Sequence, residues 1–519
     1  MGWRQASFFI HVYVTIEETM MERQYNQMNP LNAPLYEAIK KHLASAPRSF
    51  HVPGHHYGQA MKLYPKEITD DLQAVMKLDV TELSSTDDLH DPQGAIKEAQ
   101  QLAAETYGSE QTFFLIGGST AGNMALVLAH CNAGDVLIVQ RNVHKSIIHA
   151  MMLAGARAVF VQPEVDIQSG IATIPSLNNV EEALQRYPYA KAVMLSTPNY
   201  YGMGVRLHQY VRLVHAYSIP LLVDEAHGAH YGLHSELPEG ALAAGVDGVV
   251  QSTHKTLPAM TMGAMLHIQG KYINGRAVKR ILSIIQSSSP SYPIMISLDL
   301  TRAMIDAYGA QLFEQAIRTA NNIRNRISRS VPEFGIVNAE SGGDGCRYLD
   351  PLRIVLWDRT GTRSGYRLQQ ELEHYGCYTE MADPRHVVLL IGVASTDSDA
   401  DALIHACQTI ARTKVTDRAN FQTNPASFPC GLPVSEPIVF VLGSDHSQDR
   451  SETIPLAEAE GRVCDEMIIP YPPGIPILYP GERIGPEVMT TIVQLAEHGA
   501  KFQTASDSTL QTIRVVQGS

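Results

Sequence analysis

The amino-acid sequence predicts an α/β protein whose large domain holds a seven-stranded, mostly parallel sheet with helices on both faces. Short apolar runs recur from about residue 95, helix-length amphipathic segments separate them, and polar residues follow several runs. The predicted strands lie at residues 113–116, 136–139, 158–161, 192–195, 220–223, 246–250 and 262–268. The helices predicted between them lie at residues 120–131, 145–154, 180–187, 207–217 and 239–244.

The segment before the sheet contains one predicted helix and one distinctive loop. Residues 1–28 are interpreted as an extension or flexible arm outside the main folded unit. An amphipathic helix is expected at 34–45, where apolar residues recur on one face. A loop is expected at 51–58, which has three histidines, two glycines and a proline. It fits two interpretations, a segment that reaches an active site or a structural turn.

A second, smaller α+β region is expected after the sheet. It begins with a long helical stretch at 303–329, and two strands are predicted at 352–357 and 387–393. Two helices are predicted at 366–375 and 399–413.

The C-terminal part follows a linker rich in proline and polar residues. Residues 468–482 contain five prolines and two glycines and are expected to form a rigid loop rather than a strand. The predicted organisation is an N-terminal extension at 1–28, an N-terminal segment at 29–94, a large α/β domain at 95–330, a small α+β domain at 331–415, a linker at 416–436 and a small C-terminal domain at 437–519.

Composition excludes several classes of partner. The 519-residue chain is 45% hydrophobic and 18% charged, as in globular proteins, and its formal net charge of −13 argues against nucleic-acid binding. No apolar run approaches the ~18 residues that span a bilayer, so no membrane segment is expected. The six cysteines form no C-x-x-C pair, which favours reduced thiols in a cytoplasmic protein without a metal site.

A glycine-rich stretch follows the first predicted strand and opens a helix. Residues 117–123 read Gly-Gly-Ser-Thr-Ala-Gly-Asn, and they match neither a P-loop nor a dinucleotide fingerprint. Free N–H groups and hydroxyls at a helix N-terminus can bind phosphate oxygens. The stretch therefore fits a cup for a monophosphate cofactor, with a plain helix cap as the alternative.

Three further residues follow predicted strands and complete one candidate site. Asp224 ends the fifth strand, where a buried acid needs a cationic partner such as a protonated heterocyclic nitrogen. His144 follows the second strand, where its ring can stack on a cofactor. Lys255 lies between two apolar runs, where it is available to form a Schiff base. Together with Ser119 and Thr120 as phosphate ligands, they predict a pyridoxal 5'-phosphate site at the carboxyl edge of the sheet.

At this point the chain resembles a known family. Residues 30–519 are similar to the bacterial class-I Orn/Lys/Arg decarboxylases, in the short form without the N-terminal wing domain. The resemblance rests on the motifs HVPGH at 51–55, DDLH at 87–90, GGSTA at 117–121, RNVHKS at 141–146, DEAHGAH at 224–230, STHK at 252–255 and YPPGIP at 471–476.

The resemblance implies pyridoxal-phosphate fold type I, as in aspartate aminotransferase. It also implies a homodimer or higher homo-oligomer with active sites at the interface, in which the 286–292 stretch reaches the partner subunit's cofactor. It implies Lys255, His227 and His144 as catalytic residues. The implied cofactor-binding residues are Ser119, Thr120, Ala121, His144, Asp224, Ala226, His227, Ser252, His254, Lys255 and Ser288.

The expected reaction is decarboxylation of a basic amino acid to the corresponding amine and CO2, with a role in polyamine biosynthesis. It would run through an external aldimine and a quinonoid, with Lys255 or His227 returning a proton to Cα. Arginine, lysine and ornithine all remain possible substrates, with a weak preference for arginine. Acids that could receive the distal cation are Asp87, Asp88 and Glu482, although capping or surface roles fit them equally.

Two other functions fit the same residues. An aminotransferase or aldolase uses the same lysine and aspartate, and a transaminase needs an arginine to clamp the α-carboxylate. Arginines that could do so are Arg347, Arg353, Arg363 and Arg385. A catalytically inactive regulatory homologue is the more remote alternative, and it would form no Schiff base at Lys255.

Overall fold

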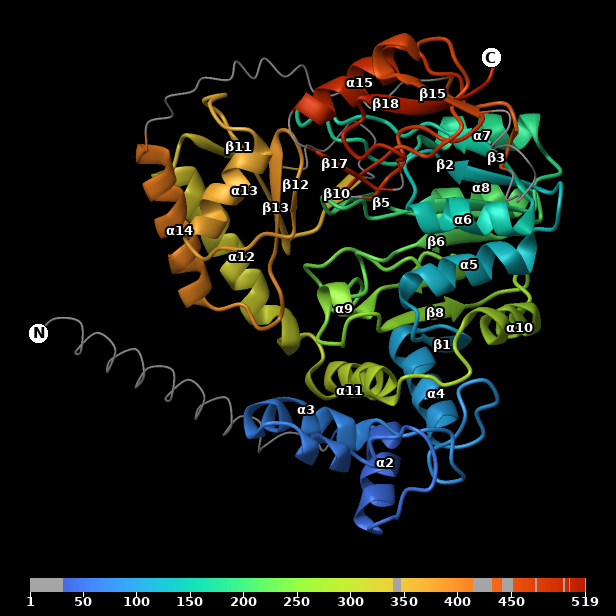
Figure 1. Cartoon of the computed structure of the whole chain (residues 1–519), viewed down its shortest axis with the longest axis vertical. Helices are drawn as coiled ribbons and strands as arrows, with labels where there is room; N and C mark the ends of the chain where they lie inside the picture. Colours follow the sequence, from blue (N-terminus) through green and yellow to red (C-terminus); the bar gives the residue numbers. More distant parts are fainter. Residues whose placement is uncertain are drawn as a thin grey trace, which may run out of the picture.

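The computed structural model describes residues 31–338, 347–413, 432–440, 451–471, 474–497, 500–503 and 505–518. Within these residues, the largest sheet has eight strands in the order β1-β8-β7-β6-β4-β2-β3-β14 (Figure 1). They span β1 Gln111–Leu115, β2 Val136–Gln140, β3 Arg157–Val161, β4 Ala192–Ser196, β6 Leu221–Asp224, β7 Gly248–Gln251, β8 Ala264–Ile268 and β14 Ile438–Val439. All seven predicted strands are confirmed, and β14 extends the sheet beyond β3.

The strands of this sheet are mostly parallel, as predicted. The strands β3, β2, β4, β6 and β7 run parallel to one another. Antiparallel pairing occurs at the edges, where β8 joins β7 to β1 and β14 joins β3. The parallel strands therefore end at one edge, where ligands bind in folds of this kind.

Helices cover both faces of the sheet. They span α5 Gly118–His130, α6 Lys145–Ala154, α7 Leu177–Arg186, α8 His208–Ala216 and α10 Gly275–Ile285. Leu137 and Val139 of β2 belong to the core under α5, α6 and α10. Val136 and Ile138 belong to the core under α7 and α8. Neighbouring residues of a strand point to opposite faces, so both faces of β2 are apolar and buried.

One predicted helix of the large domain is wrong. Residues 239–244 form a loop and a turn, not a helix. Pro238 and Gly245 bound the segment and leave too few residues for a stable helix. The Ala241 N–H donates to Glu225 Oε1 at 2.9 Å instead of to a helical carbonyl.

The N-terminal segment packs against the strands β1 and β8 at one side of the sheet through α2 (Pro34–Ala44) and α4 (Ala95–Tyr107). The helix predicted at 34–45 is confirmed, and it buries Leu35 and Ile39. Residues 51–58 form a loop, as predicted. The next helix, α3 (Lys66–Leu78), is amphipathic, yet none of its residues is buried.

The helical stretch predicted at 303–329 is two helices, α11 (Tyr292–Tyr308) and α12 (Gln311–Ser330). Gly309 separates them with a φ of 53°, a backbone conformation that disfavours residues with a Cβ. The chain then enters a second sheet of order β12-β13-β11-β9, covered by α12, α13 and α14. These elements span β9 Phe334–Ile336, β11 Arg353–Asp358, α13 Gly365–His374, β12 Met381–Ala382, β13 His386–Leu390 and α14 Asp397–Arg412.

The smaller sheet confirms the two strands and two helices predicted there. A separate strand pair connects it to the large domain, because β10 (Arg347–Leu349) pairs with β5 (Met203–Val205). This connection brings the beginning of β11 close to the carboxyl edge of the large sheet.

The described residues of the C-terminal part form two strand pairs and the α-helix α15 beside the large sheet (Figure 1). The elements span β15 Ser451–Pro455, β16 Ile469–Tyr471, α15 Pro486–Glu497, β17 Lys501–Gln503 and β18 Thr512–Val516. The prediction that 468–482 lacks a strand is wrong at β16, which pairs with β17. Pro470 is tolerated because a two-stranded pair leaves one side of each strand without a hydrogen-bonding neighbour.

Of the predicted linker, residues 416–431 lie outside the described residues, and the predicted domain limits stay predictions. Among the helices that the structure describes, none is both long and apolar enough to cross a membrane.

Candidate active site

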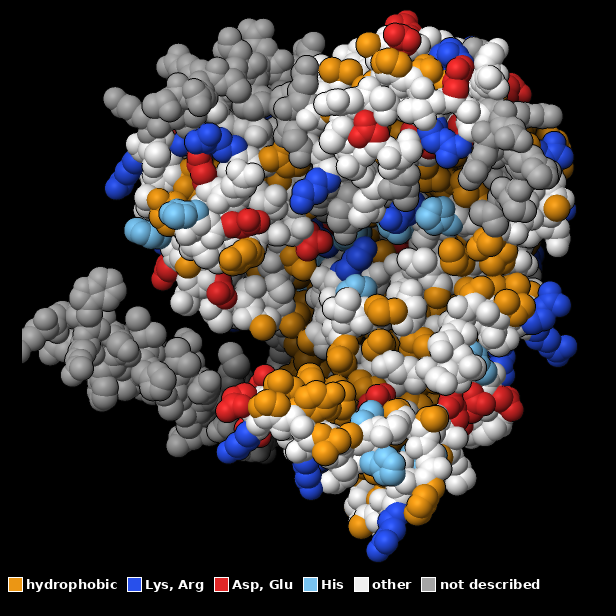
Figure 2. All heavy atoms as spheres, viewed as in Figure 1, with side chains coloured by type: hydrophobic (Ala, Val, Ile, Leu, Met, Phe, Trp, Pro, Cys, Tyr) orange, Lys and Arg blue, Asp and Glu red, His pale blue; other side chains and the backbone are white. Residues whose placement is uncertain are grey.

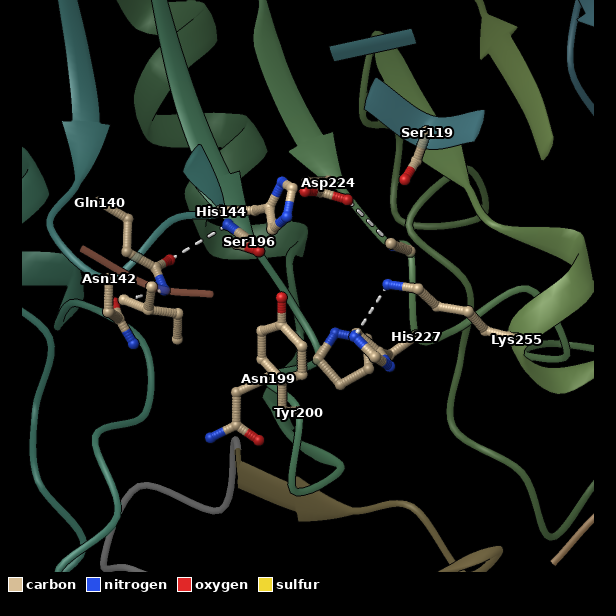
Figure 3. Close-up of a pocket in the computed structure, with 13 residues that line it drawn as sticks. Ser119, Gln140, Asn142, His144, Ser196, Asn199, Tyr200, Asp224, His227 and Lys255 are labelled. Atoms are coloured by element: carbon tan, nitrogen blue, oxygen red, sulfur yellow. Dashed lines mark hydrogen bonds between the residues drawn. The ribbon is translucent and has the colours of Figure 1, made fainter. Parts of the chain in front are cut away.

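A pocket lies at the carboxyl edge of the large sheet (Figure 3). Its lining comes from the carboxyl ends of β2, β4 and β6 and the loops that follow them, from the helices that follow β1 and β7, and from the C-terminal part. The lining residues are Ser119, Gln140, Asn142, His144, Ser196, Pro198, Asn199, Tyr200, Asp224, Ala226, His227, Lys255 and Ile475. Six residues predicted for the site therefore meet in one pocket, namely Ser119, His144, Asp224, Ala226, His227 and Lys255.

Lys255 lies on the short helix α9 (Thr253–Thr256), which directly follows β7. Its Nζ points into the pocket and lies 3.2 Å from His227 Nε2. Burial lowers the pKa of the Lys255 amine, and Asp224 acts in the opposite direction. Burial thus favours the neutral amine, which is the nucleophilic form needed for Schiff-base formation.

Asp224 is the last residue of β6, and its side chain is 4% exposed. Asn123 Nδ2 donates to Asp224 Oδ2 at 2.9 Å, and the Ala226 N–H donates to Oδ1 at 3.1 Å. Burial raises the pKa of the Asp224 carboxyl, whereas Lys255 and the Asn123 hydrogen bond lower it. A carboxylate in such a site is stabilised by a further cationic donor, and a protonated ring nitrogen supplies one.

The N-terminus of α5 forms the other end of the site. Gly118 has a φ of 69°, and no side chain caps the start of the helix, because the N-cap residue is Gly117. The Gly118 N–H itself donates to the Met262 carbonyl at 3.0 Å. Ser252 Oγ donates to Ser119 Oγ at 2.8 Å, which brings two predicted phosphate ligands together. This end has the amides and hydroxyls that a phosphate group needs. Thr120 and Ala121 lie in the same helical turn but do not line the pocket.

Two neutral histidines lie between these ends. Burial, together with the nearby Lys255, lowers the pKa of His144 to about 3. The Ser146 N–H donates to His144 Nδ1 at 3.2 Å, which caps α6 and fixes the ring. Burial also lowers the pKa of His227 well below its usual value. The ring of Tyr200 lies 4.5 Å from the His227 ring and helps to orient it.

Two further candidates from the sequence do not line this pocket. His254 does not line the pocket, and its Nδ1 lies 2.9 Å from the Gly263 carbonyl oxygen. Ser288 is exposed and likewise does not line the pocket of its own chain. Among the described residues, no cluster of three or more His, Cys, Asp or Glu side chains has the arrangement of a metal site.

The three acids considered for the distal cation have other partners. Asp87 accepts the N–H groups at the start of α4, including those of Gly94 and Ile96 at 2.9 Å each. Asp88 accepts the His90 N–H. Glu482 binds Arg141. These contacts give each acid a structural role, and none of the three lines the pocket.

Some lining residues have no local sequence signal. Gln140 and Ser196 end strands and Asn142 follows one, so the only signal that could have identified them is their position at the carboxyl ends of predicted strands. Tyr200 and Ile475 lie in loops, and no sequence pattern around them indicates that these loops reach the pocket. Arg353, at the start of β11, is 1% exposed, and its Nη2 lies 2.9 Å from His227 Nδ1.

This combination of fold and site defines a pyridoxal-phosphate enzyme of fold type I. A buried carboxylate, an uncapped helix N-terminus with paired serines and a lysine with a lowered pKa fit the ring nitrogen, phosphate and aldehyde of that cofactor. When bound, pyridoxal phosphate acts as an electron sink for bonds broken at Cα.

The chain belongs to the Orn/Lys/Arg decarboxylase family. Residues 33–341 match the model of the family's major domain, and residues 444–503 match that of its C-terminal domain. The predicted family, fold class, cofactor and enzyme class, a decarboxylase, are thereby confirmed.

Relatives cover nearly the whole chain. An uncharacterized protein of Bacillus subtilis, YaaO, is 41% identical over 90% of this chain and 94% of its own length. The arginine decarboxylase of the same organism is 33% identical over 94% of this chain and 99% of its own length. The solved constitutive lysine decarboxylase of E. coli is similar in fold, with a TM-score of 0.76, 20% identity and coverage of 98% and 84%.

Arg141 holds the C-terminal loop against the pocket wall. Its guanidinium donates to both Glu482 carboxylate oxygens and to the Pro476 and Ile477 carbonyls. It also lies 3.9 Å from the centre of the Tyr479 ring. Ile475 reaches the pocket from this loop.

Replacing Arg141 with methionine is therefore expected to lower the free energy of unfolding by about 3 kcal/mol, because Glu482 then loses its partner in a largely buried site. Urea denaturation followed by circular dichroism measures the change. Arg186→Met is the matched control, since Arg186 also bonds a glutamate but is more exposed, and it should cost less than about 1 kcal/mol. Equal losses in the two variants would contradict the anchoring role.

Proposed function

We propose that this protein decarboxylates a basic amino acid, preferably arginine, to the corresponding amine and CO2, and so serves polyamine biosynthesis. The observation that carries the proposal is the joint placement of Lys255 and Asp224 on one pocket of a family decarboxylase fold. The preference for arginine is supported by relatives named arginine decarboxylase, which are 32–35% identical to this chain. Relatives named lysine decarboxylase are 22–24% identical.

We assign the following roles to the residues of the pocket. Lys255 carries the cofactor through its amine, Asp224 keeps the ring nitrogen protonated, and His144 stacks on the ring. Lys255 or His227 returns a proton to Cα after CO2 has left. Ser119, Thr120, Ala121, Ser252 and His254 bind at the phosphate end, Ala226 lies beside the ring, and Ser288 serves the partner subunit's site.

We propose that Arg353 binds the α-carboxylate of the substrate. It is buried near Lys255, and its Nε and Nη1 atoms have no hydrogen-bond partner among the described residues. An unpaired buried guanidinium nitrogen is costly, and a carboxylate oxygen satisfies it. Arg363 bonds Glu371 and two carbonyls instead, and Arg385 lies near two carbonyls and over Trp357. The side chain of Arg347 lies outside the described residues.

A substrate panel tests this proposal. The purified protein with pyridoxal phosphate is given arginine, lysine or ornithine, and CO2 and amine are measured. We expect kcat/KM to be highest for arginine, by at least about tenfold, since a site that hydrogen-bonds a guanidinium leaves polar groups unpaired around a shorter ammonium. Preference for lysine or ornithine would overturn the arginine assignment, and absence of CO2 with all three would overturn the function.

The alternative reaction is transamination or aldol cleavage on the same fold. Arg353 favours this alternative as well, because a transaminase also needs a carboxylate clamp. The same panel separates the reactions, since a transaminase produces a keto acid and no CO2.

We further propose a homodimer, or a higher homo-oligomer, with active sites at the interface. Its support is an exposed apolar surface, here called the α3 face, made of Ile68, Leu72, Val75 and Met260, each 41–44% exposed. Figure 2 shows the hydrophobic side chains gathered over α3. Met260 belongs to the loop after Lys255, and it lines a surface hollow together with Leu72 and Val75. Such a patch is typical of an interaction surface.

Replacing Leu72 with aspartate is expected to weaken this dimer at least about 30-fold, because an unpaired carboxylate would be buried at the interface. Sedimentation velocity at several concentrations measures the effect. Ile167→Asp is the control, since Ile167 is 93% exposed and lies outside the α3 face. A monomeric wild-type protein would contradict the proposal, as would equal effects of the two substitutions.

We propose a cytoplasmic location as well. It is supported by the cysteines of the described residues, which are free thiols at positions 131, 377, 407 and 464.

A further inference from the structure

Three side chains from distant parts of the chain form a hydrogen-bonded row that starts in the pocket wall, at Lys255 and His227, and ends at Arg353 behind it. Arg353 Nη2 lies 2.9 Å from His227 Nδ1, and His227 Nε2 lies 3.2 Å from Lys255 Nζ. His227 is 4% exposed and Arg353 is 1% exposed, so water competes little for these contacts. The row joins β11 of the small domain to the loop after β6 and to α9.

The chemistry of arginine determines the direction of both hydrogen bonds. A guanidinium only donates, so His227 Nδ1 must accept. A neutral imidazole that accepts at one nitrogen carries its proton on the other. His227 Nε2 is then a donor, and its partner, Lys255 Nζ, must offer a lone pair. An ammonium has no lone pair, so this row is complete only when Lys255 is a free amine.

We propose that Arg353 is a positioning residue that locks His227 in the tautomer with its proton on Nε2, so that His227 donates to Lys255 Nζ and favours the free amine. The inference deepens the proposed function and rests on it for the role of Lys255 as the cofactor-carrying amine. It gives Arg353 a task that exists before any substrate enters the pocket.

The surroundings of the row agree with this direction. Burial lowers the pKa of His227, and the neighbouring Lys255 and Arg353 act in the same direction, so the imidazole is neutral. Burial lowers the pKa of Lys255 too, and Arg353 adds to this, while Asp224 and Glu380 act in the opposite direction. Asp224 and Glu380 alone would favour the ammonium form of Lys255. The N–H of His227 Nε2 opposes them, because it needs the lone pair of the free amine.

The tautomer of His227 is a direct test. The full-length protein, freed of cofactor and labelled with nitrogen-15 in histidine, gives two-bond proton–nitrogen spectra that separate the two tautomers. We expect the Nε2–H form in the wild type and a shift toward the Nδ1–H form in Arg353→Met. Arg353→Lys restores a donor to Nδ1, so the Nε2–H form should return in that variant. His227→Gln identifies the signal by removing it. An unchanged Nε2–H form in Arg353→Met would overturn the proposal.

The reactivity of Lys255 gives a second readout. Pyridoxal phosphate added to the cofactor-free protein at pH 7 forms a Schiff base whose visible absorbance reports the rate. Arg353→Met is expected to slow this rate by about tenfold, the effect of raising the pKa of the amine by one unit. His227→Gln should stay nearer the wild-type rate than His227→Asn, because only the glutamine amide places an N–H where Nε2 was. Equal rates in these two variants would contradict the row.

Neither readout uses an amino-acid substrate. A protein that passes both tests but releases no CO2 would contradict the proposed function and leave the role of Arg353 intact. If the wild type decarboxylates normally but its His227 carries the proton on Nδ1, the proposed function stands and the role of Arg353 is contradicted. Circular dichroism of each variant confirms that the chain remains folded.

Discussion

Replacing Lys255 with alanine is expected to abolish decarboxylation and the visible Schiff-base absorbance together. Alanine has no amine, so the cofactor loses its covalent attachment, and the pocket loses the group that the His227 contact orients. We expect a loss of kcat/KM of roughly 10⁴-fold or more, as for the removal of a catalytic nucleophile. Measurement of CO2 release and of the absorbance spectrum on one sample checks both parts.

The matched control for this variant is Lys97→Ala. Lys97 is an exposed lysine on α4, and its side chain makes no contact that the site requires. It should keep the wild-type spectrum and rate. An unchanged spectrum in Lys255→Ala would instead favour the inactive homologue, in which no Schiff base forms at this position.

Replacing Asp224 with asparagine is expected to reduce kcat by about 10²- to 10³-fold while the protein still folds and binds the cofactor. The substitution keeps the size of the side chain but removes the charge that holds a protonated ring nitrogen. It also brings an amide group opposite Asn123 Nδ2, which now donates to the carboxylate at 2.9 Å. Steady-state kinetics and cofactor titration separate the loss of rate from a loss of binding.

Asp247→Asn is the control for the removal of a buried acid. Asp247 is 2% exposed and binds His215 and the Leu221 N–H, away from the residues that line the pocket. This variant should lose stability but keep the intrinsic rate of the folded enzyme. Comparable losses of kcat in both variants would mean that Asp224 acts through folding and not through the cofactor ring.

The sequence was most informative where a local pattern has one physical solution. Apolar runs such as 136–139 must be buried on both faces, and parallel strands need helical connections, so the order of strands and helices followed. Predictions failed where a local pattern had competing solutions. At 239–244 the Glu225 carboxylate satisfies a backbone N–H, and at 303–329 a single glycine breaks the helix.

The sequence by itself determined the fold class, the cofactor and the placement of Lys255 and Asp224 in one site, because these depend on residues at strand ends, and its motifs determined the family. Only the tertiary structure decided that Arg353 meets His227 behind the pocket and that Arg141, not a substrate cation, engages Glu482. These contacts join residues far apart in the chain. Their partners are chosen by how the small sheet and the C-terminal loop dock on the large sheet, and no local pattern records that choice.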